Sequence, residues 1–99
     1  MAPRLKLQQL LETFTDNVYF QPPENVRLEY PCIIYERNYA DTKFADDNPY
    51  THVIRYMIIV IDQNPDSEIP GKVASMPMSI FNRFYTVDNL NHDVFNVFF

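Results

Sequence analysis

The strongest β-strand signal in the chain reads His52-Val53-Ile54-Arg55-Tyr56-Met57-Ile58-Ile59-Val60-Ile61-Asp62. Its first half alternates in part between apolar and polar residues, as a strand with one wet face does. From Tyr56 to Ile61 every residue is apolar, so both faces of the strand are apolar there. We therefore expect a central strand of a sheet, with Met57 to Ile61 buried on both faces.

A second strand precedes this one, and a polar connection joins the two. Residues Cys32 to Arg37 favour a strand, and Pro31 is tolerated at a strand's first position. The connection from Asn38 to Thr51 contains several Asp and Asn residues and is long for a hairpin loop. Long connections are often functional or form interfaces, so we expect partner contacts in this segment.

The sequence predicts a short helix and two aromatic strands downstream. Ser67 follows a turn and can cap a helix that begins at Glu68 and stops before Pro77. The two strands are expected over residues 79–87 and 93–99, and the hairpin turn between them over residues 88–92.

Upstream, apolar residues recur at helical spacing at Leu7, Leu10, Leu11 and Phe14. Pro3 suits the first turn of this helix, and a turn cluster at Thr15–Asn17 ends it before a short strand at Val18–Phe20. Pro22 and Pro23 then stiffen an extended segment.

The predicted order of elements is α-β-β-β-α-β-β. Strands joined by hairpins, with the helices packed on one face, indicate the α+β class and a mainly antiparallel sheet with two helices. A chain of 99 residues has room for one core, so residues 1–99 are expected to form a single domain.

The composition excludes several classes of protein. The chain has 8 Lys+Arg against 13 Asp+Glu, a net charge of −5, which argues against a surface that grips nucleic-acid phosphates. The single glycine, Gly71, excludes Gly-rich phosphate loops. The sequence shows one cysteine, no signal-peptide pattern and no transmembrane run, so we expect a soluble cytoplasmic protein that needs no disulfide.

Two sets of residues could carry chemistry. Cys32 with His52 or His92 could form a nucleophile–base pair, but a cysteine beside two isoleucines is more often a small buried hydrophobe. One Cys and two His also lack the close spacing of a zinc site. Three aspartates of the connection could bind a hard cation: Asp41, Asp46 and Asp47. Their spacing does not match the twelve-residue calcium loop, and its glycine is absent, so carboxylates that are simply solvated are favoured.

Other features have simpler explanations. The dipole of the short helix is enough to explain two carboxylates near its start, Asp66 and Glu68. Paired-carboxylate catalysis with Asp62 is possible but unspecific, because the sequence shows neither a pocket nor a shifted pKa. The 15% aromatic content could stack bases, but the acidic balance favours aromatics in a thin core and an oligomer interface. The residues alone thus predict a soluble α+β domain with protein contacts.

Four strings of sequence carry a resemblance to a known family. They are Tyr30-Pro31-Cys32-Ile33-Ile34-Tyr35-Glu36, Asp41-Thr42-Lys43-Phe44-Ala45-Asp46, Ile61-Asp62-Gln63-Asn64-Pro65-Asp66-Ser67-Glu68-Ile69-Pro70 and Asp88-Asn89-Leu90-Asn91-His92-Asp93-Val94-Phe95. In this order they resemble the small tail terminator (tail completion) proteins of tailed bacteriophages, from the head–tail joining region. The resemblance covers the chain from Leu5 to Phe99.

The resemblance implies a structural role in virus assembly. Tail terminators form rings, commonly hexamers, that cap the tail tube and dock it to the neck of the head. It therefore implies a virion protein, assembled in the host cytoplasm, with further copies of itself, a tail tube protein and a neck or head-completion protein as partners. It offers no catalytic, cofactor-binding or metal-binding residues.

Two further expectations follow. DNA would pass through the ring without specific binding, since the wall is acidic or near neutral. Position and composition single out candidate interface residues in two segments: Asp41, Lys43, Phe44, Asp46, Asp47 and Tyr50 in the long connection, and Pro22 and Pro23 in the stiff segment. The alternatives are another neck or head-completion protein and, from a different class, a small hydrolase that uses Cys32 or the loop aspartates.

Overall fold

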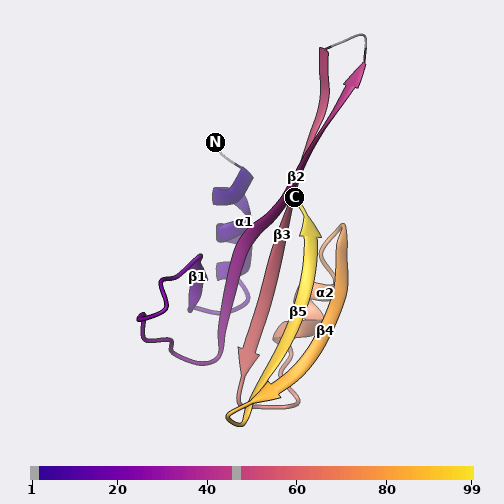
Figure 1. Cartoon of the computed structure of the whole chain (residues 1–99). Helices are drawn as coiled ribbons and strands as arrows, with labels where there is room; N and C mark the ends of the chain where they lie inside the picture. Colours follow the sequence, from indigo (N-terminus) through magenta and orange to yellow (C-terminus); the bar gives the residue numbers. More distant parts are fainter. Residues whose placement is uncertain (1–2, 46–47) are drawn as a thin grey trace.

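The computed structural model describes residues 3–45 and 48–99, with the backbone alone for residue 3 and residues 39–53. These residues form, in chain order, α1 (Pro3–Glu12), β1 (Val18–Phe20), β2 (Cys32–Ala45), β3 (Asn48–Asp62), α2 (Ile69–Ala74), β4 (Ser79–Val87) and β5 (Leu90–Phe98) (Figure 1). The strands make one sheet in the order β1-β2-β3-β5-β4. β1 pairs in parallel with β2, and the other neighbours pair antiparallel. The expected α+β class and order of elements are confirmed.

The core lies between the two helices and one face of the sheet. Helix α1 buries Leu7 and Leu11 fully, in agreement with the helical spacing in the sequence. Helix α2 adds Ile69 and Val73 to the same cluster. β3 contributes every second residue to this face, and these side chains are buried: Tyr56, Ile58 and Val60.

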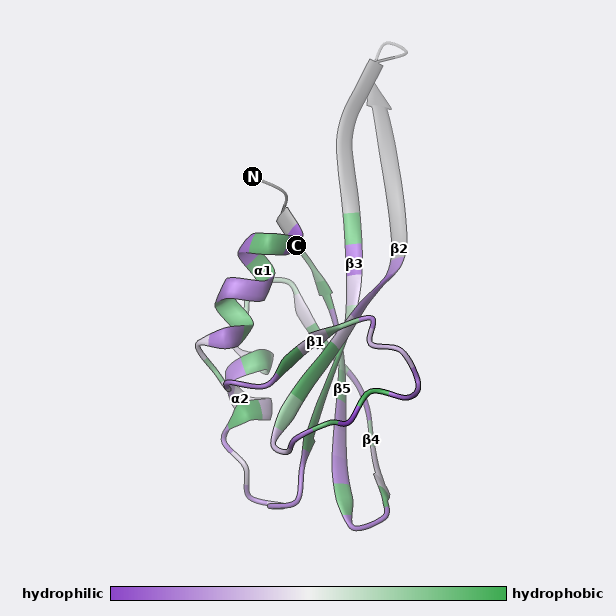
Figure 2. Ribbon diagram, turned by 90° about the vertical axis from the view of Figure 1, so that its left-hand side faces the viewer, coloured by the Kyte–Doolittle hydropathy of each residue, from purple (hydrophilic) through white to green (hydrophobic). Residues whose placement is uncertain are grey.

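The prediction that Met57 to Ile61 is buried on both sides is wrong for the face of the sheet that lies opposite the helices. Met57 and Ile59 are only half-buried, because both helices pack on the other face (Figure 2). We call the face without helices the open face. Cys32, Ile61 and Val94 also belong to it, since they align with these residues across the sheet, and they are buried. The strand is therefore central in the sheet, but its two faces differ.

A buried tyrosine joins α1 to the sheet. Tyr35 on β2 is 0% exposed, and its hydroxyl donates to Gln8 Oε1 and accepts a hydrogen bond from Arg4 Nη1 at 3.3 Å. Burial raises the pKa of Tyr35, so the hydroxyl keeps its proton at neutral pH. The guanidinium of Arg4 also lies 4.6 Å from the centre of the Phe20 ring, which connects α1 to β1.

The predicted polar connection over residues 38–51 is wrong, because two strands continue through most of it. β2 runs on to Ala45 and β3 begins at Asn48, and the two pair with bulges after Arg37 and Lys43. Thr, Tyr, Phe and Val at intervals favour strands, and pairing overrides the loop preference of the Asp and Asn residues. β5 pairs with β3 only from Arg55 onward, so the part of β2 and β3 beyond this point stands out as a two-stranded ribbon (Figure 1). We call residues 39–45 and 48–53 the arm.

Two element boundaries also differ from the sequence prediction. Helix α2 begins at Ile69 rather than Glu68, and Ser67 Oγ accepts a hydrogen bond from the Ile69 N–H at 3.3 Å. β5 begins at Leu90, because the turn needs only Asp88 and Asn89, which have φ values of 54° and 63°. Asp and Asn tolerate this left-handed conformation. A two-residue hairpin turn requires it, because only such a turn matches the right-handed twist of the two strands that it joins.

Candidate protein-interaction surfaces

The arm holds most of the interface residues expected from sequence. Asp41, Lys43, Phe44 and Tyr50 lie on its two strands, and the backbone pairs Asp41 with Val53. Asp46 and Asp47 lie outside the described residues. The molecule measures 52 × 25 × 22 Å, and the arm accounts for much of the long dimension (Figure 1). Residues that are expected to contact partners are thus carried away from the body of the domain.

Pro22 and Pro23 lie in a different place, in the segment of residues 21–31 between β1 and β2. Pro22 is half-buried and Pro23 is exposed. Figures 1 and 2 place this segment beside the body of the sheet, away from the arm. Asn17 Nδ2 donates to the Pro31 carbonyl at 3.1 Å, which fastens the end of the segment. The expected interface residues therefore form two separate surfaces rather than one.

A third surface, at the edge strand β4, was missed by sequence reasoning. Its apolar side chains are exposed by half or more: Ile80 58%, Phe81 55%, Phe84 54% and Val87 50%. Register places Phe81 and Phe84 on the helix side and Ile80 and Val87 on the open face. A half-exposed aromatic side chain leaves on the order of 100 Å² in water, so Phe81 and Phe84 leave apolar area exposed on the helix side of this edge, and Ile80 and Val87 leave a second area exposed on the open face.

A weak signal for this surface exists in the sequence. Residues 79–87 read Ser-Ile-Phe-Asn-Arg-Phe-Tyr-Thr-Val, with neighbouring apolar pairs rather than strict alternation. Such a pattern fits a strand with two apolar faces, which is either central or covered by a partner. The structure places β4 at the edge, with an irregular register between Phe81 and Arg83. The pattern could have indicated an interface only once the strand order was known.

Polar aromatic contacts stiffen the open face of β4 and β5. The rings of Tyr85 and His92 stack with centroids 4.5 Å apart and an angle of 12° between their planes. The guanidinium of Arg83 lies 5.4 Å from the centre of the Tyr85 ring. Arg83 is the single charged residue of β4, so this cation sits in the middle of an otherwise uncharged edge strand.

An open groove of about 390 Å³ lies between the two helices. Its lining comes from the end of α1 and from α2 with the residues that follow it: Leu10, Phe14, Lys72, Ser75, Met76 and Pro77. The lining is mainly apolar and carries one cation. It suits contact with an apolar group rather than chemistry on a polar substrate.

Cys32 does not form a nucleophile–base pair in this structure. It is 0% exposed, and burial, with a smaller contribution from the charge of Asp62, raises the pKa of its thiol to about 11. His92 is two strands away, roughly 10 Å across the sheet. His52 lies nine residues along β3 from the partner of Cys32, roughly 30 Å away. The prediction of a small buried hydrophobe is confirmed.

Among the acidic residues near α2, the carboxylate of Asp62 holds the turn that precedes the helix. Asp62 Oδ1 accepts a hydrogen bond from the Asn64 N–H at 2.9 Å, and Asn64 Oδ1 accepts one from the Asp66 N–H at 3.0 Å. Among the side chains that the structure describes, those of residues 4–38 and 54–99, no group of three from His, Cys, Asp or Glu could hold a metal ion. Within residues 3–45 and 48–99, neither helix has the length and apolar character to span a bilayer.

Protein-family models, curated proteins and solved structures give no match to this chain. Its function is therefore inferred from the three surfaces described above, together with the resemblance carried by its sequence strings. All three are candidate surfaces for protein contact: the arm, the segment of residues 21–31 and the edge of β4.

Proposed function

We propose that this chain is a structural subunit of a tailed bacteriophage that closes the end of the tail tube as a ring and docks it to the neck of the head. The resemblance to tail terminators supplies the specific role. The observation that carries an assembly role is the arm, which extends two paired strands beyond the body of the sheet.

The physical argument is that an isolated two-stranded ribbon is marginally stable in water. Beyond Arg55 the arm has neither a third strand nor a described helix beside it, as the pairing of residues 3–45 and 48–99 shows. A small domain gains little stability of its own from such an extension. The arm is explained if a neighbouring subunit or the tube covers it in the assembled particle.

The other surfaces fit the same role. A ring subunit contacts a neighbour on each side and another protein above or below, so it needs several separate contact surfaces. The edge of β4 and the segment of residues 21–31 supply surfaces in addition to the arm. Partners in this proposal are further copies of the chain, the tail tube protein and a neck or head-completion protein.

Charge fits a channel through which DNA slides. Each chain carries −5, so a hexamer, the number that the resemblance implies, would carry a net charge of −30. Repulsion keeps DNA from adhering to the wall, and at physiological salt it acts over about 8 Å. The residues that line the lumen therefore matter more than the total charge, and we propose a lining that is acidic or near neutral.

The test is a cryo-electron microscopy reconstruction of phage particles that carry this protein, with particles lacking it as the control. We expect a ring of this fold between tube and neck, and unjoined heads and tails in its absence. Density for the protein outside the head–tail axis would overturn the proposal. A ring on the head side of the joint would instead identify a neck or head-completion protein, and a lumen lined by Lys and Arg would contradict the sliding argument.

A further inference from the structure

We infer that neighbouring copies join by strand pairing between the arm of one copy, through the outer edge of residues 39–45, and the edge of β4 of the next. The inference rests on the proposed ring for its occupant, a second copy, and adds the identity of the two surfaces that meet. The unpaired edges of the sheet are the evidence for it.

Within residues 3–45 and 48–99, the sheet and its arm have four stretches of open edge, and two of them are poor partners. β1 is three residues long and is followed within three residues by Pro22 and Pro23, so its edge is short and blocked. The outer edge of β3 in the arm contains Pro49, which has no N–H to donate. An exposed edge of this kind is protected against pairing with another chain.

The two remaining edges match each other. β4 is nine residues long and contains no proline. Residues 39–45 of β2 read Tyr-Ala-Asp-Thr-Lys-Phe-Ala, also without proline, and their outer edge is free because β1 pairs only with residues 33–35. A long apolar edge such as β4, with half-exposed Phe81 and Phe84, is an aggregation site unless a specific partner covers it.

Charge favours the arm over a second β4 as the occupant. Arg83 is the middle residue of β4, so an antiparallel pairing of two β4 strands in full register sets the two Arg83 side chains against each other. Like charges directly opposite in a sheet are destabilising. Residues 39–45, which make the proposed contact, instead contain one aspartate and one lysine, so pairing with them does not require two like charges to face each other, and Asp41 is complementary to Arg83.

Pairing of arm to edge has a consequence for the assembly. The contact is between two different surfaces, so every copy gives an arm and receives one. Such a head-to-tail contact continues from copy to copy and closes into a ring when the rotation between copies allows it. A β4–β4 contact would use the same surface twice and stop at a dimer.

The test is chemical cross-linking between added cysteines with a short bismaleimide, which tolerates a register shift of a residue or two. The variants are Thr42→Cys in the arm and Asn82→Cys in β4, with the native Cys32 left buried in both. We expect a cross-linked dimer when the two variants are mixed at high protein concentration, and none with either variant alone. Gln9→Cys, on the exposed side of α1, replaces Asn82→Cys in the control mixture and should give no dimer.

Further variants make the outcome sharper. Phe84→Ser added to the Asn82→Cys chain should lower the yield of cross-linked dimer about tenfold, since it removes most of an apolar side chain from the strand contact without adding a charge. A chain with both Thr42→Cys and Asn82→Cys should give a ladder of covalent oligomers. Circular dichroism checks that each variant is folded.

The results separate this inference from the proposed function. Absence of the dimer in the mixture, or cross-linking of Asn82→Cys with itself, overturns pairing of the arm to β4. Neither result bears on the proposed function, because the reconstruction tests separately where the protein lies in the particle. A ladder from the double variant supports the pairing even if the reconstruction finds the protein away from the head–tail axis, in which case only the proposed function fails.

Discussion

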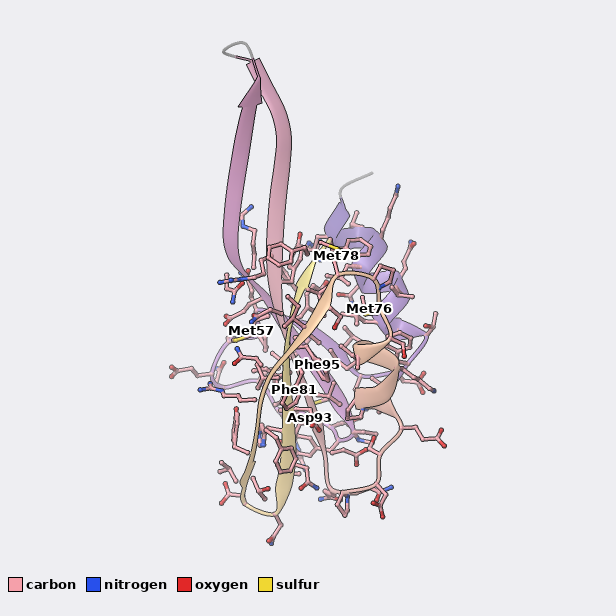
Figure 3. The ribbon with its side chains drawn as sticks, turned by 90° about the vertical axis from the view of Figure 1, so that its right-hand side faces the viewer. Met57, Met76, Met78, Phe81, Asp93 and Phe95 are labelled. Atoms are coloured by element: carbon pink, nitrogen blue, oxygen red, sulfur yellow. The ribbon has the colours of Figure 1, made fainter. Side chains whose placement is uncertain are left out.

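The rings of Phe81 and Phe95 meet edge to face across β4 and β5, with centroids 5.6 Å apart, yet Phe95 is 2% exposed and Phe81 is 55% exposed (Figure 3). The boundary of the core therefore runs between two paired strands. β5 is the last strand of this side of the sheet that contributes side chains to the core cluster, and the apolar side chains of β4 are half or more exposed. The exposed apolar side chains of β4 therefore leave an edge of the sheet that a partner can cover.

The difference between the two faces of β3 can be tested at neighbouring residues. Ile58 is 0% exposed on the helix face, and Ile59 is half-buried on the open face. We expect Ile58→Asp to prevent folding, because it places an unpaired charge in the core at a cost above about 4 kcal/mol. Ile59→Asp should fold and lose roughly 1–2 kcal/mol, because its carboxylate reaches water.

Urea denaturation followed by circular dichroism measures both variants, and each is the other's control for the chemical change. If Ile59→Asp also fails to fold, the open face is covered in the free protein, and the assignment of one wet face is wrong.

The thiol of Cys32 should react slowly in the native protein. A pKa of about 11 in place of 9.0 lowers the reactive thiolate fraction about a hundredfold at mildly alkaline pH, and burial of the side chain adds to this protection. Labelling with a thiol reagent, compared between native protein and protein in denaturant, measures the ratio. Equal rates would show that β2 opens readily at Cys32.

Sequence reasoning reached the fold where local patterns agree with the packing. The spacing of Leu7 and Leu11 placed α1, and the serine signal placed the start of α2 to within one residue, although the helix ends at Ala74, earlier than Pro77 indicated. It failed on the arm, because Asp, Asn and Pro between residues 38 and 51 resemble a loop until the partner strand is known. It failed on β4 for a related reason, since the exposure of Phe84 depends on strand order and on how far the helices extend across the sheet.

The hydroxyl of Tyr35 should stabilise the docking of α1. Tyr35→Phe removes one hydrogen bond to Gln8 and one from Arg4 inside a buried contact, and we expect a loss of about 1–2 kcal/mol in the free energy of unfolding. Tyr19→Phe is the matched control, because the Tyr19 hydroxyl accepts a single hydrogen bond, from the Glu29 N–H, in an exposed place. A smaller loss for Tyr35→Phe than for Tyr19→Phe would remove the role assigned to this contact.

Asp93 should make stability fall with rising pH. Burial raises the pKa of its carboxyl, against a smaller lowering by the charge of His92. The folded chain then binds this proton more tightly than the unfolded chain, so stability is lost as the pH rises from the usual pKa of the carboxyl through the raised one. We expect Asp93→Asn to be more stable than the native chain at neutral pH and to lose this advantage in acid. Urea denaturation across this range, with the exposed Asp16→Asn as control, measures the difference, and a constant offset at all pH values would contradict the assignment.

The arm should be dispensable for folding and needed for assembly. Ala40 pairs with Ile54, so an Asn-Gly turn in place of residues 41–53 closes the hairpin at the edge of the body. Because β5 pairs with β3 only from Arg55 and β1 pairs with β2 only at residues 33–35, we expect the free energy of unfolding to stay within about 1 kcal/mol of the native value. The same chain should fail to join heads to tails in a complementation assay. The control variant keeps the full arm and carries Asp46→Asn with Asp47→Gly, which separates the length of the arm from the acidity of its sequence. A shortened chain that unfolds would make the arm part of the core, and one that still assembles particles would show that the arm contacts no essential partner.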